Sequence, residues 1–551
     1  MRAHKIYLNK IGDPYILSTA LGLILSLSMV IWMIYIILIK GLGLFWASDL
    51  IEVKLKTGEK YLGELREYST SISLDPSGKQ LEKKEIQLKI GNRDLYGRDF
   101  VWILESDISQ KVKPEFATTF ERWDYGNFYG NLQKLQVGDK IVEENAIVIY
   151  EEAKQALDEV HYNKERIEEL ENELNELITP LSRIQREISL LEISSEVKTS
   201  TGMQKLETLR NKALELEKDI TEEYVRISEQ LQQYKNLNRN IYLEVQTADG
   251  NIQNIGLESV VRFYQPNRMN SFSKSLLYVS RLFEFVSADP RESNTEGGIF
   301  PAIFGTVLMV LLMSIVVVPF GVLAAIYLNE YAKQGTVIRL IRLSVNNLAG
   351  VPSIVFGIFG LGFFIYMVGG TIDQLFFSHK LPEPTFGTGG ILWASLTLAL
   401  LTVPVVVVAT EEGILAVPRA NKEGALALGA TRWQMIRKIV LPNAMPGILT
   451  GLILAISRGA GEVAPLMITG VVKLAPSLAV DGSFPFLHLD RKFMHLGFHI
   501  YDVGFQSPNV EAAKSMVYTT ALLLIFLVVI LNLLAIYLRN RLRKKYKSAA
   551  F

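Results

Sequence analysis

Long apolar runs alternate with polar stretches along this chain of 551 residues. A membrane-spanning helix needs about 20 mostly apolar residues, and six runs reach that length. They cover residues 16–39, 299–328, 348–368, 391–410, 448–471 and 517–537. The first run is longer than the apolar part of a signal peptide, and no convincing small-residue cleavage site follows it, so we expect it to remain as a span. The pattern predicts an α-helical integral membrane protein with six transmembrane helices.

A long polar stretch, residues 41–297, separates the first run from the second. Residues 50–145 and 241–265 alternate between apolar and polar positions in short runs broken by turn residues such as Gly and Asn. Such alternation is typical of β-strands and hairpins. We therefore predict a soluble insert with a small β-rich part, and we find no catalytic constellation in it. It is either a solvated spacer or a platform for a soluble partner.

The stretch between these two β-rich segments, residues 146–240, has a helical pattern instead. Its apolar residues step by three and four, first over 167–191 and then over 206–227, which is typical of a coiled-coil seam. A gap rich in Ser, Thr and Gly at 194–202 separates the two series, so we predict an antiparallel coiled-coil hairpin. Pro180 argues for a kink or an interruption in the first arm. The arms pair with each other or with another copy, and the pattern leaves this open.

Lys and Arg near the span ends predict the orientation, because cytoplasmic loops carry an excess of both. Basic residues precede the first span at Arg2, His4, Lys5 and Lys10, and the tail 539–547 is strongly basic. Both termini are therefore expected in the cytoplasm, and the insert outside it. The expected domains are 1–40 with the first span, the insert 41–297, and 298–551 with five spans and a cytoplasmic loop over 411–446.

The composition excludes several kinds of chemistry for this chain. The formal net charge is zero, 49% of residues are apolar, 21% are charged and there is no cysteine, so disulfides and thiolate metal sites are not available. No Gly-rich phosphate loop of the GxxxxGK[ST] kind occurs, so we expect the chain not to hydrolyse ATP, not to be an enzyme and to bind no cofactor of its own. We also expect no nucleic acid among its partners.

The segment 423–442, EGALALGATRWQMIRKIVLP, lies between two apolar runs and is amphipathic with net positive charge. It predicts a cytoplasmic loop folded as a short helix, a turn and a second helix. Gly429 can supply the positive φ that ends the first helix, and Pro442 cannot continue the second.

This segment resembles the coupling loop of ABC importer permeases, the subunits that hold a separate ATPase. The resemblance implies that ATPase coupling rests on Glu423, Ala425, Gly429, Ile439, Leu441 and Pro442. Gly424 stands where that family usually has alanine, which is a mild departure.

Further stretches narrow the resemblance to the permeases of phosphate-specific ABC importers. They are 297–306, 346–357, 387–395 and 457–465, and the similarity covers about 297–545. The resemblance implies a type I importer permease fold in a bacterial inner membrane, with the insert in the periplasm. It also implies a second permease subunit, a dimer of ATPase subunits that use ATP–Mg, and a periplasmic phosphate-binding protein.

The fifth run contains Arg458 and Glu462, although a charge at mid-span costs roughly 2.5–3.5 kcal/mol on insertion scales. Both should face the bundle interior or an aqueous path, and their spacing would place them on one helix face. Either they form an ion pair that holds helices together, or Arg458 binds an oxyanion that Glu462 orients or releases. Asn347 and Pro352, where we expect a kink, complete the predicted substrate path.

Two other hypotheses remain. His488, His495 and His499 share an outer loop, and two of them have a spacing that can bind a metal, but no companion Glu completes a known motif. We predict no metal site. The alternative function is a membrane-anchored coiled-coil scaffold or sensor that signals phosphate status.

Overall fold

The computed structural model describes residues 13–547 except 75–79, 194–198, 483–484 and 508–509. Two sequence predictions lie outside these residues, namely the basic residues before Asp13 and part of the gap between the helical arms. The chain divides into two compact units. Unit 1 comprises Met1–Phe45 and Phe283–Phe551, and unit 2 comprises Trp46–Leu282. The division falls within one helix, α6 (Ser271–Ser287), rather than at residue 297.

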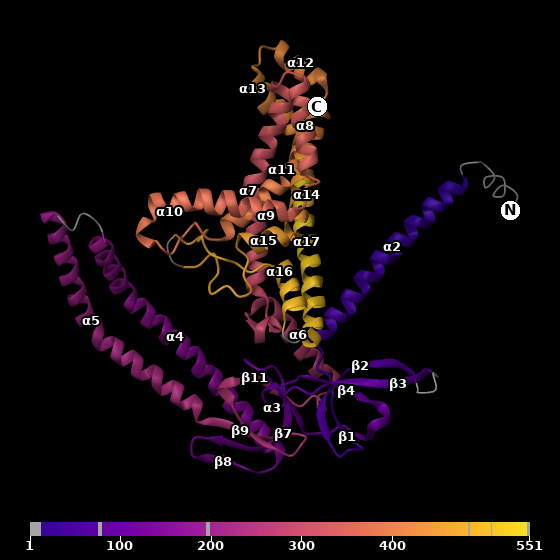
Figure 1. Ribbon diagram of the computed structural model, residues 1–551, viewed down its shortest axis with the longest axis vertical. Helices are drawn as coiled ribbons and strands as arrows, with labels where there is room; N and C mark the ends of the chain where they lie inside the picture. The colour runs from indigo at the N-terminus through magenta and orange to yellow at the C-terminus, as the bar shows by residue number, and fades with distance from the viewer. Residues whose placement is uncertain (1–12, 75–79, 194–198, 483–484, 508–509, 548–551) are drawn as a thin grey trace. The chain divides into compact units, whose positions relative to one another are not determined.

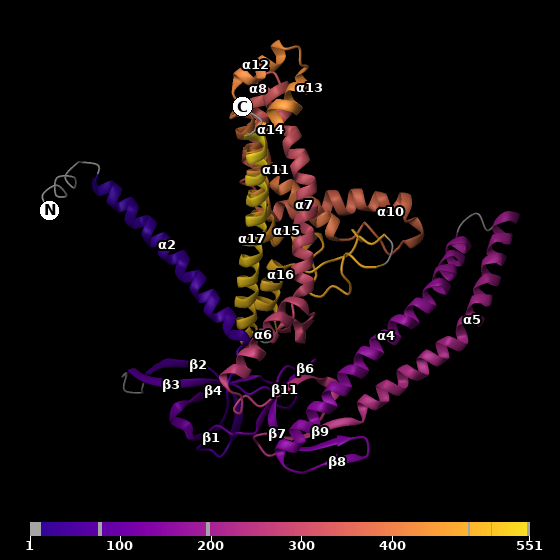
Figure 2. The ribbon, with the colours of Figure 1, turned by 180° about the vertical axis from the view of Figure 1, so that it is seen from behind.

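Unit 1 is helical and contains six helices long and apolar enough to cross a membrane, which confirms the six predicted spans. The spans are Tyr15–Phe45, Phe300–Tyr331, Ser353–Phe376, Ile391–Leu415, Arg432–Gly461 and Ala513–Arg541. Four long helices of this unit run side by side in both views of Figures 1 and 2. They are α7 (Phe300–Ile326), α11 (Ile391–Leu415), α14 (Leu441–Gly461) and α17 (Val510–Lys547). α2 (Asp13–Leu42) touches α17 where Thr519 donates to the carbonyl of Gly41 at 2.8 Å.

Shorter elements connect the long helices of unit 1. A π-helical turn, η7 (Tyr327–Tyr331), extends α7 and is followed by α8 (Thr336–Leu348). The third span consists of α9 (Ser353–Phe359), the π-helix η8 (Gly360–Gly369) and α10 (Gly370–Phe376). The remaining pieces are α12 (Arg419–Ala427), α13 (Arg432–Met435), η10 (Ile436–Val440), α15 (Ala464–Thr469), α16 (Leu496–Tyr501) and η11 (Asp502–Gln506).

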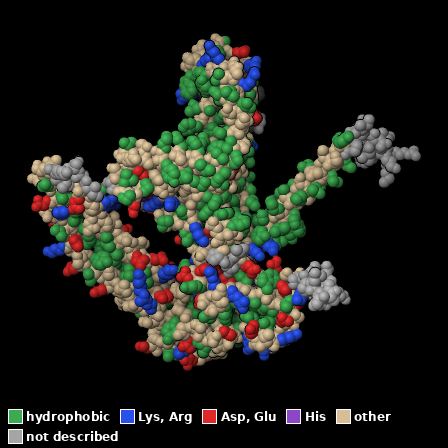
Figure 3. Space-filling view, viewed as in Figure 1, with side chains coloured by type: hydrophobic (Ala, Val, Ile, Leu, Met, Phe, Trp, Pro, Cys, Tyr) green, Lys and Arg blue, Asp and Glu red, His purple; other side chains and the backbone are tan. Residues whose placement is uncertain are grey.

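The bundle core follows from composition, because its helices are apolar on every side and small residues let their backbones approach closely. Met309, Met313, Val317, Leu398 and Val406 are fully buried within it. Figure 3 shows apolar side chains covering much of the visible surface of these helices, as lipid contact requires.

Unit 2 contains two antiparallel sheets. The first has the order β4-β3-β2-β1-β5, and the second the order β10-β9-β7-β6-β11 with β8 beside β7. The strands of the first are β1 (Leu50–Leu55), β2 (Lys60–Leu74), β3 (Gln80–Lys89), β4 (Phe100–Leu104) and β5 (Ile108–Val112). Those of the second are β6 (Ala117–Arg122), β7 (Phe128–Val137), β8 (Lys140–Val142), β9 (Ile241–Gln246), β10 (Ile252–Gly256) and β11 (Val260–Tyr264). Strand β9 pairs with β7 although about a hundred residues separate them, so the segment between them is an insertion in this sheet.

That insertion is a pair of long helices, α4 (Ala146–Ile193) and α5 (Ser200–Arg239). Their contacts run in antiparallel order, because Asn163 donates to Asn238 at 2.9 Å and Arg210 pairs with Glu192 at 2.7 Å. Helix α4 continues through Pro180, so of the two alternatives expected there the interruption is wrong and the kink stays a prediction. Pro180 is exposed, and water can hydrate the carbonyl that loses its donor.

Candidate functional site

The motif of residues 423–442 forms a compact helical turn at one end of unit 1. Helix α12 begins after Pro418, and Gly429 follows it with φ of +86°, the left-handed value expected for this glycine. The amide of Gly429 donates to the carbonyl of Leu426 at 3.0 Å, and that of Ala430 to Ala425 at 3.1 Å. The turn therefore closes the helix with its own backbone and reverses the chain.

The next helix begins with a capping box. The side chain of Thr431 accepts from the amide of Gln434 at 3.2 Å, while the amide of Thr431 donates to the Gln434 side chain at 2.9 Å. These reciprocal bonds satisfy two amides that a helix start would otherwise leave unpaired.

The predicted stop at Pro442 is wrong. Helix α13 continues through η10 into α14, so Arg432–Gly461 is one continuous helix. The wider π turn of η10 directly precedes Leu441 and Pro442, which lies in the first turn of α14. A π turn changes the hydrogen-bond register, and it therefore accommodates a residue without an amide hydrogen. The predicted second coupling helix and the fifth span are thus mechanically joined.

An apolar core anchors this region to the long helices. Ala425, Met435, Ile436 and Val440 are buried against residues of α7, α8 and α11, with Ile439 and Leu441 half-buried beside them. Glu423 and Gly429 are exposed. The residues of the motif therefore divide into a buried set that holds the helices and an exposed set that faces outward.

Two ion pairs add to this anchor. Lys422 of α12 lies 2.7 Å from Glu330 of η7, and both side chains are mostly buried. Arg342 of α8 lies 3.3 Å from Glu411 of α11. The amide of Asn329 also donates to Glu411 at 3.1 Å. Sequence reasoning missed these partners because they are 69 to 92 residues apart in the chain.

The outer surface of the turn is apolar at its tip. Leu428 is 91% exposed and Trp433 is 53% exposed. Arg432, Arg437 and Lys438 are exposed near them. An exposed leucine and tryptophan with a cationic rim fit a protein interface.

A second candidate site lies at the other end of α14, where the helix breaks. Arg458 is in its last turn, and its Nε lies 3.5 Å from Glu462 Oε1, with both side chains partly exposed. Glu462 is the C-cap residue of α14, and its ψ of 131° turns the following chain out of the helix, while its side chain still pairs with Arg458 one turn earlier. Pro465 explains the break, because a helix continuing to it would place its ring against the carbonyl of Gly461.

The other predicted path residues cluster at a second chain break. Asn347 lies in the last turn of α8 with its side chain exposed, and Pro352 is the N-cap of α9. In the described part of the chain, no hydrogen bond or ion pair joins Asn347 to Arg458 or Glu462.

The helices that follow the two breaks do meet. A Cβ added at Gly357 of α9 would lie 2.7 Å from Cα of Pro465 in α15. A Cβ added at Gly360 would lie 2.3 Å from Oγ1 of Thr397 in α11. Backbone contact of this kind requires glycine. Gly357 and Gly360 were not predicted as site residues, although glycines spaced three apart in an apolar run are a usable signal.

The histidines of the outer loop are placed separately. His495 and His499 are buried on α16, and burial lowers the pKa of His495 to about 3 and that of His499 to about 4. His488 instead contacts Asp481 at 3.0 Å. Among the residues that the structure describes, no group of three His, Asp or Glu side chains is arranged to hold a metal.

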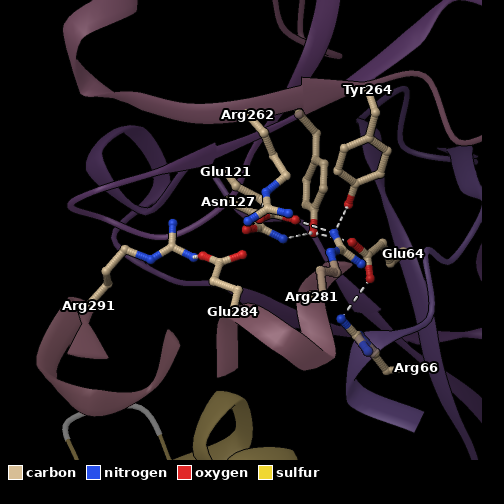
Figure 4. Close-up of polar contacts among 10 residues, drawn as sticks. Glu64, Arg66, Glu121, Asn127, Arg262, Tyr264, Arg281, Glu284 and Arg291 are labelled. Carbon is tan, nitrogen blue, oxygen red and sulfur yellow. Dashed lines mark hydrogen bonds and ion pairs between the residues drawn. The ribbon is translucent and has the colours of Figure 1, made fainter. Parts of the chain in front are cut away.

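Unit 2 contains a buried ionic cluster (Figure 4). Glu64 lies 2.6 Å from Arg66 and accepts from the Tyr129 hydroxyl at 2.8 Å. Burial alone would raise the pKa of Glu64, but the nearby guanidinium of Arg66 holds it below its ordinary value. Arg281 pairs with Glu121 and donates to the hydroxyl of Tyr264. These mostly buried groups are paired with one another, which fits a structural role.

The chain is similar to known transport proteins. The family described as "Binding-protein-dependent transport system inner membrane component" matches residues 317–547. The probable ABC transporter permease protein YqgI of Bacillus subtilis (strain 168) is 31% identical over 48% of this chain and 86% of its own length. The phosphate transport system permease protein PstA of Yersinia pestis is 32% identical over 46% of this chain and 75% of its own.

A third relative is the probable phosphate transport system permease protein PstA of Methanocaldococcus jannaschii, which is 33% identical over 39% of this chain and 67% of its own. Among solved structures, an inward-facing MetNI methionine ABC transporter chain is 18% identical over 45% of this chain and 93% of its own, with a TM-score of 0.31. The three sequence relatives are each more than 30% identical to this chain. The chain therefore belongs to the family of binding-protein-dependent transport system inner membrane components, the ABC importer permeases, and is similar to the phosphate permease PstA.

Proposed function

We propose that this ABC importer permease carries inorganic phosphate, with Arg458 as the residue that meets the anion. The proposal is supported by the phosphate transport named in its relatives and by one structural observation. Arg458 and Glu462 lie where a membrane helix breaks, and both remain partly exposed on this chain. Non-helical backbone at membrane depth is tolerated only where protein or a water-filled path covers it.

The chemistry of the pair fits transient anion binding. A guanidinium presents donors in a planar fork that matches the oxygens of phosphate. Glu462 Oε1 lies 3.5 Å from Arg458 Nε, close enough to compete for the same donors. An arriving phosphate would take these donors, and the return of Glu462 to Arg458 would release it. The ion pair and the anion complex are then two stages of one cycle.

We propose that Asn347 and Pro352 shape the same path from the other chain break. Gly357 and Pro465 bring the helices after the two breaks into contact, so a shift of α9 moves α15 directly. The segments after Pro352 and Glu462 would then move as a single layer.

We propose that ATP supplies the energy through partner subunits. The exposed tip with Leu428 and Trp433 would bind an ATPase subunit, and the continuous helix Arg432–Gly461 would carry its movement to Arg458. Closure of an ATPase dimer around ATP–Mg then opens the bundle outward, and hydrolysis resets it. The chain itself would bind no cofactor.

The surrounding assembly follows from the same proposal. A second permease subunit would complete the path, and a periplasmic phosphate-binding protein would deliver the anion. The chain would lie in a bacterial inner membrane with both termini cytoplasmic and the insert 41–297 periplasmic. The insert would act as a platform for a soluble partner.

The central test uses the complete transporter in vesicles loaded with ATP–Mg and radiolabelled phosphate outside. Arg458→Lys keeps the charge but loses the planar fork, so uptake should fall about tenfold or more while the complex still assembles. The double change Arg458→Gln with Glu462→Gln removes both charges and should also assemble without transporting. Near-normal uptake by the double variant would show that the pair is only structural.

The coupling proposal is tested with two glycines of the same turn. Gly429→Asp puts a side chain at a φ of +86°, whereas Gly424→Asp adds the same charge on α12 without that strain. Co-purification of the ATPase should drop more for Gly429→Asp, because the strained turn displaces the tip. Equal ATPase yields for the two variants would contradict the role of the turn.

The insert is tested by deleting residues 146–240 and rejoining β8 to β9. Uptake should persist at least in part, because the segment similar to known permeases lies outside the deletion. Normal uptake with altered phosphate-dependent regulation would favour the scaffold or sensor instead. Loss of uptake at a normal protein level would give the hairpin a direct part in transport.

A further inference from the structure

Helix α6 carries two faces of different character. Five large apolar side chains lie on one face at intervals of four, three, four and three residues. All five are exposed, by between 41% and 78%, and they are Phe272, Leu276, Val279, Phe283 and Val286. At 100° per residue they fall within one narrow stripe, flanked by the exposed serines 275, 280 and 287.

The opposite face of α6 is occupied by protein contacts. Lys274 pairs with Asp49, and Arg281 pairs with Glu121 and with the Tyr264 hydroxyl. Tyr278 packs on Trp46 with ring centroids 6.3 Å apart. These side chains hold one face of the helix in place, so the apolar stripe cannot turn inward without breaking them.

The carboxyl end of α6 is fixed to the start of a membrane span. The amide of Ile299 donates to the carbonyl of Phe285 at 2.8 Å, and that of Phe300 to Ala288 at 3.1 Å. Phe300 is the first residue of the second span. Phe285 also packs edge-on against Phe45, the last residue of the first span, at 5.3 Å between ring centroids. Phe283 and Val286 are therefore held at the boundary where one span ends and the next begins.

We propose that α6 lies in the headgroup region of the bilayer, in the leaflet where the first span ends and the second begins. Its apolar stripe would face the acyl chains. An amphipathic helix of this kind buries its apolar face about 5–10 Å into the interface. Trp46 and Tyr278, which pack on each other, are the residue types that gather at this depth. Lipid would cover the apolar stripe, because the end of α6 is held against the ends of two membrane spans.

The charges of α6 give no reason to require anionic lipids. The flanks of the stripe are serines, and the basic residues Lys274 and Arg281 are engaged with carboxylates. The attachment rests on apolar burial, so a bilayer of phosphatidylcholine alone should suffice. The helix would fix the depth at which the chain of the insert meets the membrane.

The test uses the absence of cysteine in the natural sequence, which allows single labels in the full chain. Leu276→Cys, Val279→Cys and Phe283→Cys are each labelled with a nitrobenzoxadiazole fluorophore and placed in phosphatidylcholine nanodiscs. Ile315→Cys in α7 is the lipid-exposed control, and Leu214→Cys in α5 is the water-exposed control, since both side chains are largely exposed. Quenching is measured with a lipid that carries a nitroxide near its headgroup and with iodide in the buffer.

All three α6 labels should lose roughly half of their emission to the nitroxide lipid, because they lie at its depth. Ile315→Cys lies near the middle of its span and should lose less. Iodide should quench only Leu214→Cys among the five. Iodide quenching of the α6 labels without lipid quenching would place the stripe in water and overturn the proposal. Protection from both quenchers would mean that protein covers the stripe, which also overturns it. Three positions keep the test decisive if one variant folds poorly.

Discussion

The helical hairpin of unit 2 and the helix pair α11–α14 of unit 1 are both packed helix pairs, but different residue types form their contacts. In the hairpin, Leu170, Ile227 and Leu231 form the seam, and charged pairs such as Lys235–Glu171 lie along its sides. Between α11 and α14 the contact is made by small residues. A Cβ added at Gly447 would lie 2.7 Å from Cα of Gly413, and one added at Gly451 would lie 3.0 Å from Cβ of Ala409.

The difference follows from the solvent around each pair, which is water for the hairpin and lipid for the membrane helices. Water drives large apolar side chains together, so the hairpin gains from bulky seam residues. Lipid tails are as apolar as leucine, so membrane helices gain from close backbone approach instead. Enlarging a contact residue should therefore damage one region, and shrinking a contact residue should damage the other.

The largest effect is expected from Gly447→Val, which inserts a side chain against the backbone of α11. Helices α11 and α14 would have to separate, at a cost of about 3 kcal/mol or more. The thermal unfolding midpoint of the purified permease should fall, and much of the protein should aggregate. Gly362→Val is the matched control, because a Cβ there meets nothing within 4 Å. Equal midpoints for the two variants would refute close glycine packing.

The second prediction shrinks a seam residue of the hairpin. Leu170→Ala removes a fully buried side chain and should cost about 2–3 kcal/mol locally. Hydrogen exchange in α4 and α5 should accelerate while exchange in α11 and α14 is unchanged. Leu214→Ala on the exposed side of α5 is the control and should change little. Unchanged exchange in Leu170→Ala would mean that the arms do not depend on this seam.

The third prediction compares one ion pair from each region. Lys422→Met leaves the mostly buried Glu330 without its cation and should cost about 2 kcal/mol. Lys235→Met breaks an exposed pair with Glu171, for which we expect less than about 1 kcal/mol. Thermal unfolding of unit 1 and hydrogen exchange of the hairpin measure the two costs. A larger cost for Lys235→Met would reverse the comparison.

The smallest effect per residue concerns pH. His495 and His499 have folded pKa values of about 3 and about 4, below the unfolded value, so the unfolded state binds protons first as the pH falls. Stability is complete above about pH 6.5 and is lost as the pH falls toward the folded values, by about 1.4 kcal/mol per histidine at pH 5.5. Unfolding midpoints at pH 7.5 and 5.5 measure this.

The paired control is the double variant His495→Asn with His499→Gln, which removes both groups that resist protonation. Its unfolding midpoint should be lower at pH 7.5 but should change less between the two pH values. An unchanged pH dependence in the double variant would assign the effect to other groups.

Much of unit 1 was predictable because local signals suffice for it. The length of the apolar runs alone located six spans. Gly429 indicated a turn because few other residue types adopt a positive φ. The errors occurred where a proline could act in two ways. The helix continues through Pro442 after a π turn, and α4 continues through the exposed Pro180. Helix α14 instead ends just before Pro465. The residue type alone does not choose between these outcomes.

Some residues of the candidate sites were predictable from the sequence and others were not. Arg458 and Glu462 could be found because charges are rare in apolar runs, but the end of α14 at Gly461 could not. Glu330 and Glu411 were missed because acidic residues at span ends are common, and their partners are distant in the chain.

By itself, the sequence determined which segments are long and apolar enough to cross a membrane, where the chain reverses at Gly429, and that two helical segments lie within residues 146–240. These properties depend on local backbone preference and on solvent, and both are written in neighbouring residues. Only the tertiary structure decided that Gly357 meets Pro465, that Lys422 meets Glu330, and that one face of α6 is occupied while the other is exposed. Such contacts depend on how distant helices approach, and no local pattern encodes that distance.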